Sequence, residues 1–292
     1  MEIISTTKKM QEHADSVRRL GKTIGLVPTM GFLHEGHLSL MREARKRTEH
    51  LVVSIFVNPT QFGPGEDFDA YPRAFERDAA LAEKEGVDVI FAPVETELYT
   101  KEFQTYVVLE KIPKHLCGIS RPTHFRGVAT VVAKLFNIVK PDTAVFGRKD
   151  YQQFVLIRRM AIDLNFDIEI VGFPTVRESD GLAMSSRNSY LTPEQRRSAL
   201  SLYRSLIEGR KLVKSGIKNS SRIIDSASKL INSHKETDID YISICDPETL
   251  VEMEIIDRPA IMALAVKVGK TRLIDNMMLN PSEGMTDDPS AY

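Results

Sequence analysis

The chain has few cysteines, almost no net charge and no long apolar run. Its 292 residues include only Cys117 and Cys245, too few and too far apart in sequence for a disulfide framework or a zinc ribbon. The formal net charge of −1 argues against a nucleic-acid partner, because such partners usually require a basic surface. No apolar run approaches the length of a membrane span, and residues 1–9 lack a signal-peptide core. These absences favour a cytoplasmic protein with no membrane and no nucleic-acid partner.

The composition is that of an ordinary globular protein. Hydrophobic residues make up 42% of the chain and charged residues 27%, which is enough apolar material for a sizeable core. The length exceeds the usual size of one domain, so we expect a large domain and a smaller one. No internal repeat or low-complexity tract interrupts the pattern.

Short apolar runs alternate with segments of helical spacing in the first part of the chain. The runs cover residues 23–27, 51–57, 87–91, 106–109, 143–146 and 167–171. Strands that are apolar on both faces are typical of a parallel sheet covered by helices. We therefore predict the α/β class, with a Rossmann-like parallel sheet and helices on both faces, over residues 1–175.

The pattern changes after Pro174. Two helices are predicted near residues 199–216 and 220–233, together with three strands that follow them. This segment, residues 176–292, is expected to form a smaller carboxy-terminal α+β domain that acts as a lid. Its tail, from about Pro281 onward, is expected to be disordered.

Two histidines stand where the first predicted strand gives way to a helix. The strand is expected to stop at Pro28, and the residues after His37 have helical spacing. The first N–H groups of a helix lack internal partners and carry partial positive charge, so helix starts bind phosphates. Gly36 lets a phosphate chain approach the backbone, and His34 and His37 can donate hydrogen bonds to it. Simple capping of the helix is the alternative, while a zinc site is disfavoured by the spacing of the histidines.

Polar loops also follow other predicted strands. Asn58 and Gln61 come directly after a buried strand, a position that faces the ligand crevice of an open α/β sheet, although turn chemistry is an alternative for them. Lys149 would approach phosphates at the histidine turn if its strand and the first strand are neighbours. The loop at residues 177–188 offers hydroxyls and guanidinium groups, which suit phosphate oxygens.

Four separated boxes carry a resemblance to a known family. They are Pro28–His37, Asn58–Phe62, Gly147–Gln153 and Met184–Asn188. Together and in this order they resemble the pantothenate synthetase (pantoate–β-alanine ligase) family of coenzyme A biosynthesis. The His-Glu-Gly-His box is also similar to the His-x-Gly-His signature of nucleotidyltransferases and class I tRNA synthetases. The Met-Ser-Ser-Arg box is similar to their Lys-Met-Ser-Lys loop, with Arg187 in place of a lysine.

The resemblance implies a ligase that forms a carbon–nitrogen bond in two steps. The carboxylate of (R)-pantoate attacks the α-phosphate of ATP, which gives pantoyl adenylate and pyrophosphate. The amine of β-alanine then attacks the acyl carbon, and AMP leaves. The family also implies Mg²⁺ bound with ATP, and a homodimer.

The resemblance also assigns residues to these steps. It implies that His34, His37 and Lys149 are catalytic, with His37 as the proton donor. Gln61 and Gln153 are expected to bind pantoate, Gln61 also β-alanine, and Asp78 is the carboxylate expected near Mg²⁺. The ATP-binding residues implied are Met30, Gly31, Phe32, Leu33, His34, Glu35, Gly36, His37, Gly147, Arg148, Lys149, Asp150, Val176, Met184, Ser185, Ser186 and Arg187.

Two other functions remain compatible with the histidine box. A nucleotidyltransferase acting on a phosphorylated acceptor would share this box, but should need further basic residues in place of Gln61 and Gln153. A non-catalytic nucleotide-binding module would bind ATP without turnover. Fold resemblance alone excludes neither of them, whereas the two glutamine boxes favour the ligase.

Overall fold

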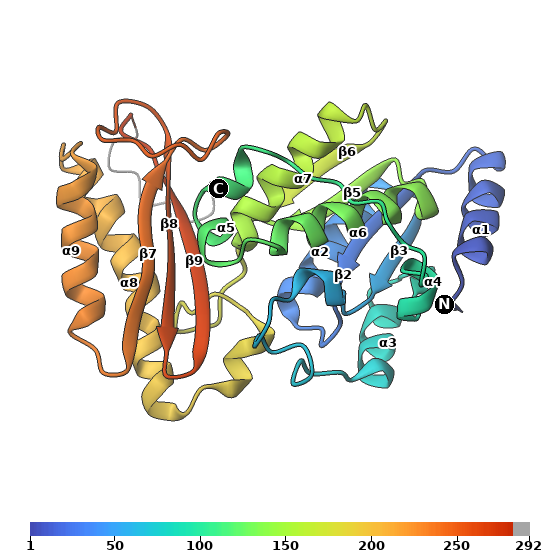
Figure 1. Ribbon diagram of the computed structural model, residues 1–292, viewed down its shortest axis with the longest axis horizontal. Helices are drawn as coiled ribbons and strands as arrows, with labels where there is room; N and C mark the ends of the chain where they lie inside the picture. Colours follow the sequence, from blue (N-terminus) through green and yellow to red (C-terminus); the bar gives the residue numbers. More distant parts are fainter. Residues whose placement is uncertain (283–292) are drawn as a thin grey trace. The chain divides into compact units, whose positions relative to one another are not determined.

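The computed structural model describes residues 1–282, and its helices and strands are labelled in Figure 1. The chain divides into two compact units, each built from several segments. The first unit comprises residues 1–110, 121–148 and 153–173, and the second comprises residues 111–120, 149–152 and the chain from 174 onward. Apart from Pro281 and Ser282, which lie in a turn, the tail expected to be disordered lies outside the described residues.

The first unit contains a six-stranded sheet in the order β1-β4-β3-β2-β5-β6, with every pairing parallel. The strands are β1 (Glu2–Ile4), β2 (Ile24–Thr29), β3 (His50–Ile55), β4 (Val89–Phe91), β5 (Thr143–Gly147) and β6 (Glu169–Phe173). The predicted parallel α/β sheet is confirmed. Strands β2 and β5 are neighbours, which was the condition for placing the turn after β5 beside the histidine turn.

Helices cover both faces of this sheet. The helices α1 (Thr7–Arg19) and α6 (His124–Val139) pack together on one face, and α2 (Glu35–Arg47) and α3 (Phe75–Lys84) contact each other on the opposite face. The remaining helices of the chain's first part are short or lie at its later end: η1 (Pro59–Gln61), α4 (Glu95–Leu98), η2 (Ile112–Lys114), α5 (Cys117–Ser120), η3 (Arg148–Asp150) and α7 (Tyr151–Asp163).

The sequence predicts that the first strand stops at Pro28, but strand β2 continues to Thr29. The backbone amides of His50, which begins β3, and of Phe56, which directly follows it, donate to Thr23 O and Thr29 O, so the odd-numbered residues of β2 face β3. The even-numbered Pro28 therefore faces the β5 side, where the pairing covers only Gly25 and Leu26. A proline is tolerated there because no ladder bond needs its missing N–H group.

Two further sequence predictions differ from the structure. The strand predicted at residues 106–109 is absent: the Val107 N–H donates to the Thr130 side chain of α6 (3.0 Å), and Val108 is largely exposed. Conversely, the helix α1, the short edge strand β1 and the one-turn helix α5 were not predicted. Segments of three or four residues are too short to show a periodicity.

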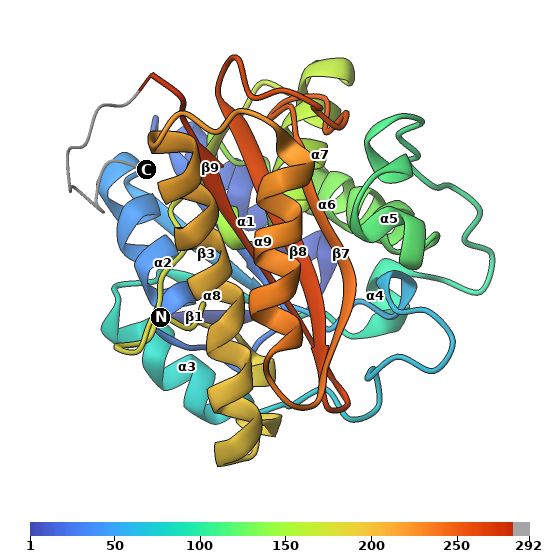
Figure 2. The ribbon, with the colours of Figure 1, turned by 90° about the vertical axis from the view of Figure 1, so that its left-hand side faces the viewer.

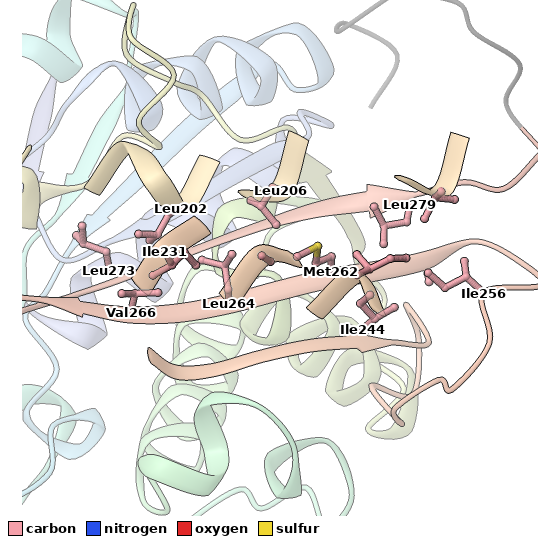
Figure 3. Packing of buried hydrophobic residues seen from close by; sticks show 14 of the residues in the cluster. Leu202, Leu206, Ile231, Ile244, Ile256, Met262, Leu264, Val266, Leu273 and Leu279 are labelled. Atoms are coloured by element: carbon pink, nitrogen blue, oxygen red, sulfur yellow. The ribbon is translucent and has the colours of Figure 1, made fainter. Parts of the chain in front are cut away.

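The second unit is an antiparallel sheet, β7 (Thr237–Cys245), β8 (Ala260–Val268) and β9 (Thr271–Leu279), with the helices α8 (Pro193–Lys214) and α9 (Ser220–Asn232) across one face (Figure 2). Helix α8 begins with a capping box between Thr192 and Gln195. Leu202 and Leu206 of α8 pack against the alternate β8 residues Met262 and Leu264 (Figure 3). The predicted smaller α+β part is confirmed. Within residues 1–282, none of the helices has both the length and the apolarity that crossing a bilayer requires.

Candidate active site

The predicted histidine turn joins β2 to α2. His34 precedes the first residue of α2, and its backbone N–H donates to His37 Nδ1 (3.3 Å), while the two imidazole centroids lie 4.1 Å apart. The histidines therefore do cap the helix, which was the simpler alternative. Because Nδ1 of His37 accepts this bond, the neutral imidazole carries its proton on Nε2. Capping and phosphate binding are thus compatible.

Asp78 of α3 fixes the turn that precedes the histidines. Its two carboxylate oxygens accept the backbone N–H groups of Phe32 (2.6 Å) and Leu33 (2.8 Å), and the residue is 1% exposed. Gly31 and Phe32 both have positive φ, +82° and +50°. A Phe residue with positive φ is strained, and the two hydrogen bonds to Asp78 offset the energetic cost of this backbone conformation.

This geometry gives Asp78 an anchoring role in the loop, and its expected contact with magnesium stays a prediction. Both carboxylate oxygens already bind the loop backbone, and the side chain is buried. Among residues 1–282, moreover, no three His, Cys, Asp or Glu side chains are grouped so that they could hold a metal ion.

Gln61, expected to bind pantoate, is oriented by a buried amide network. Asn58 is 1% exposed, donates to Gly127 O and to Gln61 Oε1 (3.1 Å), and accepts from the Tyr99 hydroxyl (2.9 Å). Gln61 Nε2 in turn donates to the sulfur of Met30, which belongs to the expected ATP segment. The structure thus brings Gln61 and the histidine box together, and it makes Asn58 a support for Gln61.

Two basic residues beside Gln61 were missed by the sequence reasoning. His124 Nδ1 donates to Gln61 O (2.8 Å), and Arg121 donates to the same carbonyl (3.3 Å) while it forms a two-bond ion pair with Glu66 (2.6 and 2.7 Å). Burial opposes ionisation of Glu66, but the guanidinium outweighs it and the pKa of the carboxyl is lowered. The only sequence signal was a pair of basic residues before an apolar helix, which is too common to be informative.

The box after β5 is divided between the two units. Gly147 and Arg148 end β5 and begin η3 in the first unit, to which Gln153 also belongs, whereas Lys149 and Asp150 belong to the second unit. A Cβ added at Gly147 would meet no atom within 4 Å. The Lys149 ammonium lies 3.9 Å from the Asp150 carboxylate and is 20% exposed.

The remaining expected ATP residues lie on one loop of the second unit. The Met184 N–H donates to Val176 O (2.9 Å), which closes the base of the loop. Ser185 caps η4 (Ser186–Tyr190) by accepting from the Arg187 N–H (3.3 Å). Gly181 in this loop has φ +95°, and the Tyr203 ring occupies the space where a Cβ would lie. Only glycine fits this turn.

Comparisons with known proteins agree with the resemblance seen in the four boxes. Residues 2–278 match the sequence model of the family described as pantoate-β-alanine ligase. The pantothenate synthetase of Desulfatibacillum aliphaticivorans is 59% identical over 281 residues, which cover 96% of the chain and 100% of that protein. That of Syntrophus aciditrophicus is 56% identical over 276 residues, covering 94% and 96%.

Solved structures give the same result. The crystal structure of pantothenate synthetase from Thermus thermophilus has a TM-score of 0.90 and 45% identity, covering 95% of this chain and 99% of that one. The pantoate-β-alanine ligase from Francisella tularensis, complexed with β-γ ATP and β-alanine, has a TM-score of 0.80 and 32% identity, covering 98% and 100%. Because these matches span nearly the whole chain in both sequence and structure, the chain belongs to the pantoate-β-alanine ligase family.

Proposed function

We propose that this chain condenses (R)-pantoate with β-alanine in two steps, through a pantoyl adenylate. The chain is a ligase of the family just named. In the first step a pantoate carboxylate oxygen bonds to the α-phosphorus of ATP and pyrophosphate leaves. In the second step the β-alanine nitrogen bonds to the acyl carbon, loses a proton, and AMP leaves. The ligands of the Francisella relative, an ATP species and β-alanine, support this substrate set.

The observation that carries the proposal is the start of α2. A carboxylate that approaches a triphosphate is an anion meeting an anion, so the site must supply donors and positive charge. The His34 and His37 imidazoles stand at a helix start whose preceding turn is fixed by Asp78. We propose that this turn binds the phosphates, and that Lys149 and Arg187 add positive charge to the same task.

Gln61 and Gln153 are proposed to hold pantoate, and Gln61 also β-alanine. An amide side chain can donate to a carboxylate or hydroxyl and can also accept from one, as a small hydroxy acid requires. The buried network around Asn58 supports this role for Gln61, because it holds the amide in one orientation. A nucleotidyltransferase would have little use for such an amide.

Magnesium is proposed to enter with ATP and to be held mainly by phosphate oxygens, as this ion usually is when it binds with a nucleotide. It would supply positive charge to the phosphates, and no step here depends on it. We further propose a cytoplasmic homodimer, as the family resemblance implies. The adenylate must be kept from water, and we propose that the carboxy-terminal domain closes over the site as a whole, with the loop at residues 181–187 as its edge.

Pyrophosphate–ATP exchange tests this proposal. The purified protein is assayed with Mg²⁺ and no acid, then with (R)-pantoate, then with (R)-pantoate and β-alanine while AMP is followed. Exchange that requires pantoate, with AMP formed only after β-alanine is added, is the expected result. Measurable ATP binding without pantoate-dependent exchange would contradict the adenylate route. AMP retained in the product would indicate a nucleotidyltransferase.

A further inference from the structure

Two neighbouring residues of β9 contact both ATP-binding segments of the second unit. Asn276 Nδ2 donates to the backbone carbonyl of Lys149 (2.8 Å), 127 positions away in the chain. Asp275 accepts two hydrogen bonds from Arg177, which begins the loop that ends at Arg187. Neither β9 residue lies in the four sequence boxes, yet one strand contacts the Gly147–Gln153 box and the loop that leads into the Met184–Asn188 box.

The Asp275 carboxylate is built into a closed arrangement. It is 4% exposed and accepts three donors: Arg177 Nη1 (2.6 Å), Arg177 Nη2 (2.9 Å) and the Asn276 backbone N–H (2.8 Å). A buried carboxylate needs such partners, because burial without them is strongly unfavourable. The pair with Arg177 is bidentate, which fixes direction as well as distance.

Arg177 connects the Asp275 carboxylate to the loop. Its Nη1 also donates to Gly181 O (3.1 Å), and its guanidinium lies 4.1 Å from the centroid of the Tyr203 ring, the same ring that packs against Gly181. Asp275 therefore holds both ends of the loop's turn through one side chain. The base of the loop, where Met184 bonds to Val176, lies directly beyond that turn.

Asn276 acts on the other segment. The Lys149 carbonyl belongs to η3, the single turn that precedes α7, and Asn276 is 9% exposed. A fixed carbonyl restricts the backbone of Lys149 and so the direction in which its side chain leaves the turn. Asp275 also receives the Asn276 N–H, so the two contacts form one connected network.

We propose that Asp275 and Asn276 are positioning residues for ATP, which hold the Lys149 turn and the Val176–Arg187 loop in one fixed arrangement. Neither residue is proposed to touch the substrate. The inference rests on the proposed function, in which both segments bind ATP. It predicts that loss of this network weakens ATP use selectively, and leaves the use of pantoate unchanged.

The test compares Asn276→Ala and Asp275→Asn with the native protein. The KM values for ATP and for pantoate are measured in pyrophosphate–ATP exchange, ATP affinity is measured by isothermal titration calorimetry, and Tm is recorded. Asn276→Ala is expected to raise the KM for ATP about fivefold or more while the KM for pantoate stays within about twofold. Asp275→Asn leaves Arg177 without its buried partner; if that variant does not fold, Asn276→Ala decides the matter alone.

Asp240→Asn is the matched control. Asp240 is also a carboxylate of this sheet paired with an arginine, Arg272 (2.6 Å), but it contacts neither ATP segment. It is expected to lower Tm while both KM values stay within about twofold of native. A KM for ATP that is unchanged in Asn276→Ala, or that rises equally in Asp240→Asn, would overturn the proposal.

Failure of the proposed function would look different. In that case the native protein itself shows no pantoate-dependent exchange. The ATP affinities of the native protein, Asn276→Ala and Asp240→Asn, measured by calorimetry, then test the positioning role. Weaker ATP binding in Asn276→Ala together with native ATP binding in Asp240→Asn supports this role. Equal ATP binding in the two variants overturns it.

Discussion

At the scale of single residues, two side chains around the histidine turn have separable tasks. Asp78 shapes the backbone before α2 through two buried hydrogen bonds, and His37 presents an N–H group at the helix start. The first task is conformational and the second chemical. Substitutions at the two positions should therefore differ in what they change.

Asp78→Asn is expected to destabilise the protein and to weaken ATP binding. Asparagine keeps one acceptor oxygen but turns an NH₂ group toward the other amide, so one buried N–H loses its partner, at a cost of about 1–3 kcal/mol. Urea unfolding and ATP affinity measure the two effects. A magnesium ligand would behave differently, because saturating Mg²⁺ would then restore the affinity.

Asp142→Asn is the matched control for Asp78. Asp142 also accepts a backbone N–H, that of Ile24 (2.7 Å), but it does so at the amino end of the strands. It should reduce stability without changing ATP affinity. If both variants weaken ATP binding equally, the effect of Asp78 is general destabilisation and the anchoring role is wrong.

His37→Ala is expected to keep the fold and to lose at least about a hundredfold in turnover, or roughly 3 kcal/mol of transition-state stabilisation. The variant removes the Nε2 donor together with the contact to the His34 N–H. Steady-state AMP formation measures the loss, and circular dichroism checks the fold. His234→Ala, which changes a histidine of α9's carboxyl end in the second unit, is the control and should turn over normally. Near-native turnover in His37→Ala would remove this residue from the mechanism.

At the scale of elements, close packing of α6 on η1 determines where Gln61 lies. A Cβ at Gly127 would lie 2.3 Å from Thr60 O and 2.6 Å from Gln61 N. Both are backbone atoms, so no side-chain rotation can relieve the overlap. Glycine is required here because the helix and the turn approach each other so closely.

Gly127→Ala is therefore expected to destabilise the protein, although the same change in an exposed helix stabilises it by about 1 kcal/mol. Overpacking should cost about 1–3 kcal/mol and shift Gln61, which would raise the KM for pantoate. Gly209→Ala in α8 is the control, because its Cβ would meet mainly the flexible end of Met262. Should the pantoate KM stay at its native value in Gly127→Ala, Gln61 is not held by this contact.

The sequence predicts most of the long elements of this fold. The apolar run at residues 51–57 indicates β3, and helical spacing indicates the helices near residues 199–216 and 220–233. Prediction from sequence fails for β1 and α5, which are too short to show a periodicity. It also fails for the strand predicted at residues 106–109, whose apolar residues face solvent or α6 instead of a partner strand.

The candidate site is predictable only where its chemistry is local. The histidine box shows a strand end, a turn and a helix start within ten residues or so, and all of these are short-range signals. The anchoring role of Asp78 and the β9 pair Asp275 and Asn276 are different. Their partners are 45 to 127 positions away, so nothing near them in sequence indicates the contact.

At the scale of the whole molecule, the shifted pKa values point to a loss of stability in acid. Ion pairs and hydrogen bonds outweigh burial and lower the pKa of Glu66 and Asp88 below their usual 4.5 and 3.8. A carboxylate with a lowered folded-state pKa stabilises the protein above its unfolded-state pKa, and this stability is lost as the pH falls through the folded-state value. The stability contributed by Glu66 and Asp88 is therefore lost only in strongly acidic solution.

His50 causes a separate loss of stability at a pH nearer neutrality. Burial is the largest cause that lowers its pKa from 6.5, with Asp88 opposing, and His50 Nε2 lies 3.0 Å from His13 Nε2. The folded protein thus binds this proton more weakly than the unfolded chain does, so the free energy of unfolding decreases as the pH falls from 6.5. The charges of Asp88, Arg45, Lys22 and His13 face this ring, and Glu2 lies beside His13.

His50→Gln is expected to flatten this dependence, because glutamine can still form a hydrogen bond but does not titrate. Urea unfolding at steps between about pH 8 and pH 5 measures the slope, which depends directly on the difference in bound protons. The comparison at pH 8, where the native imidazole is neutral, gives the packing cost of the substitution and serves as the internal control. If the slopes of native and variant protein agree, His50 takes up its proton equally in both states and the acid sensitivity near neutrality arises elsewhere.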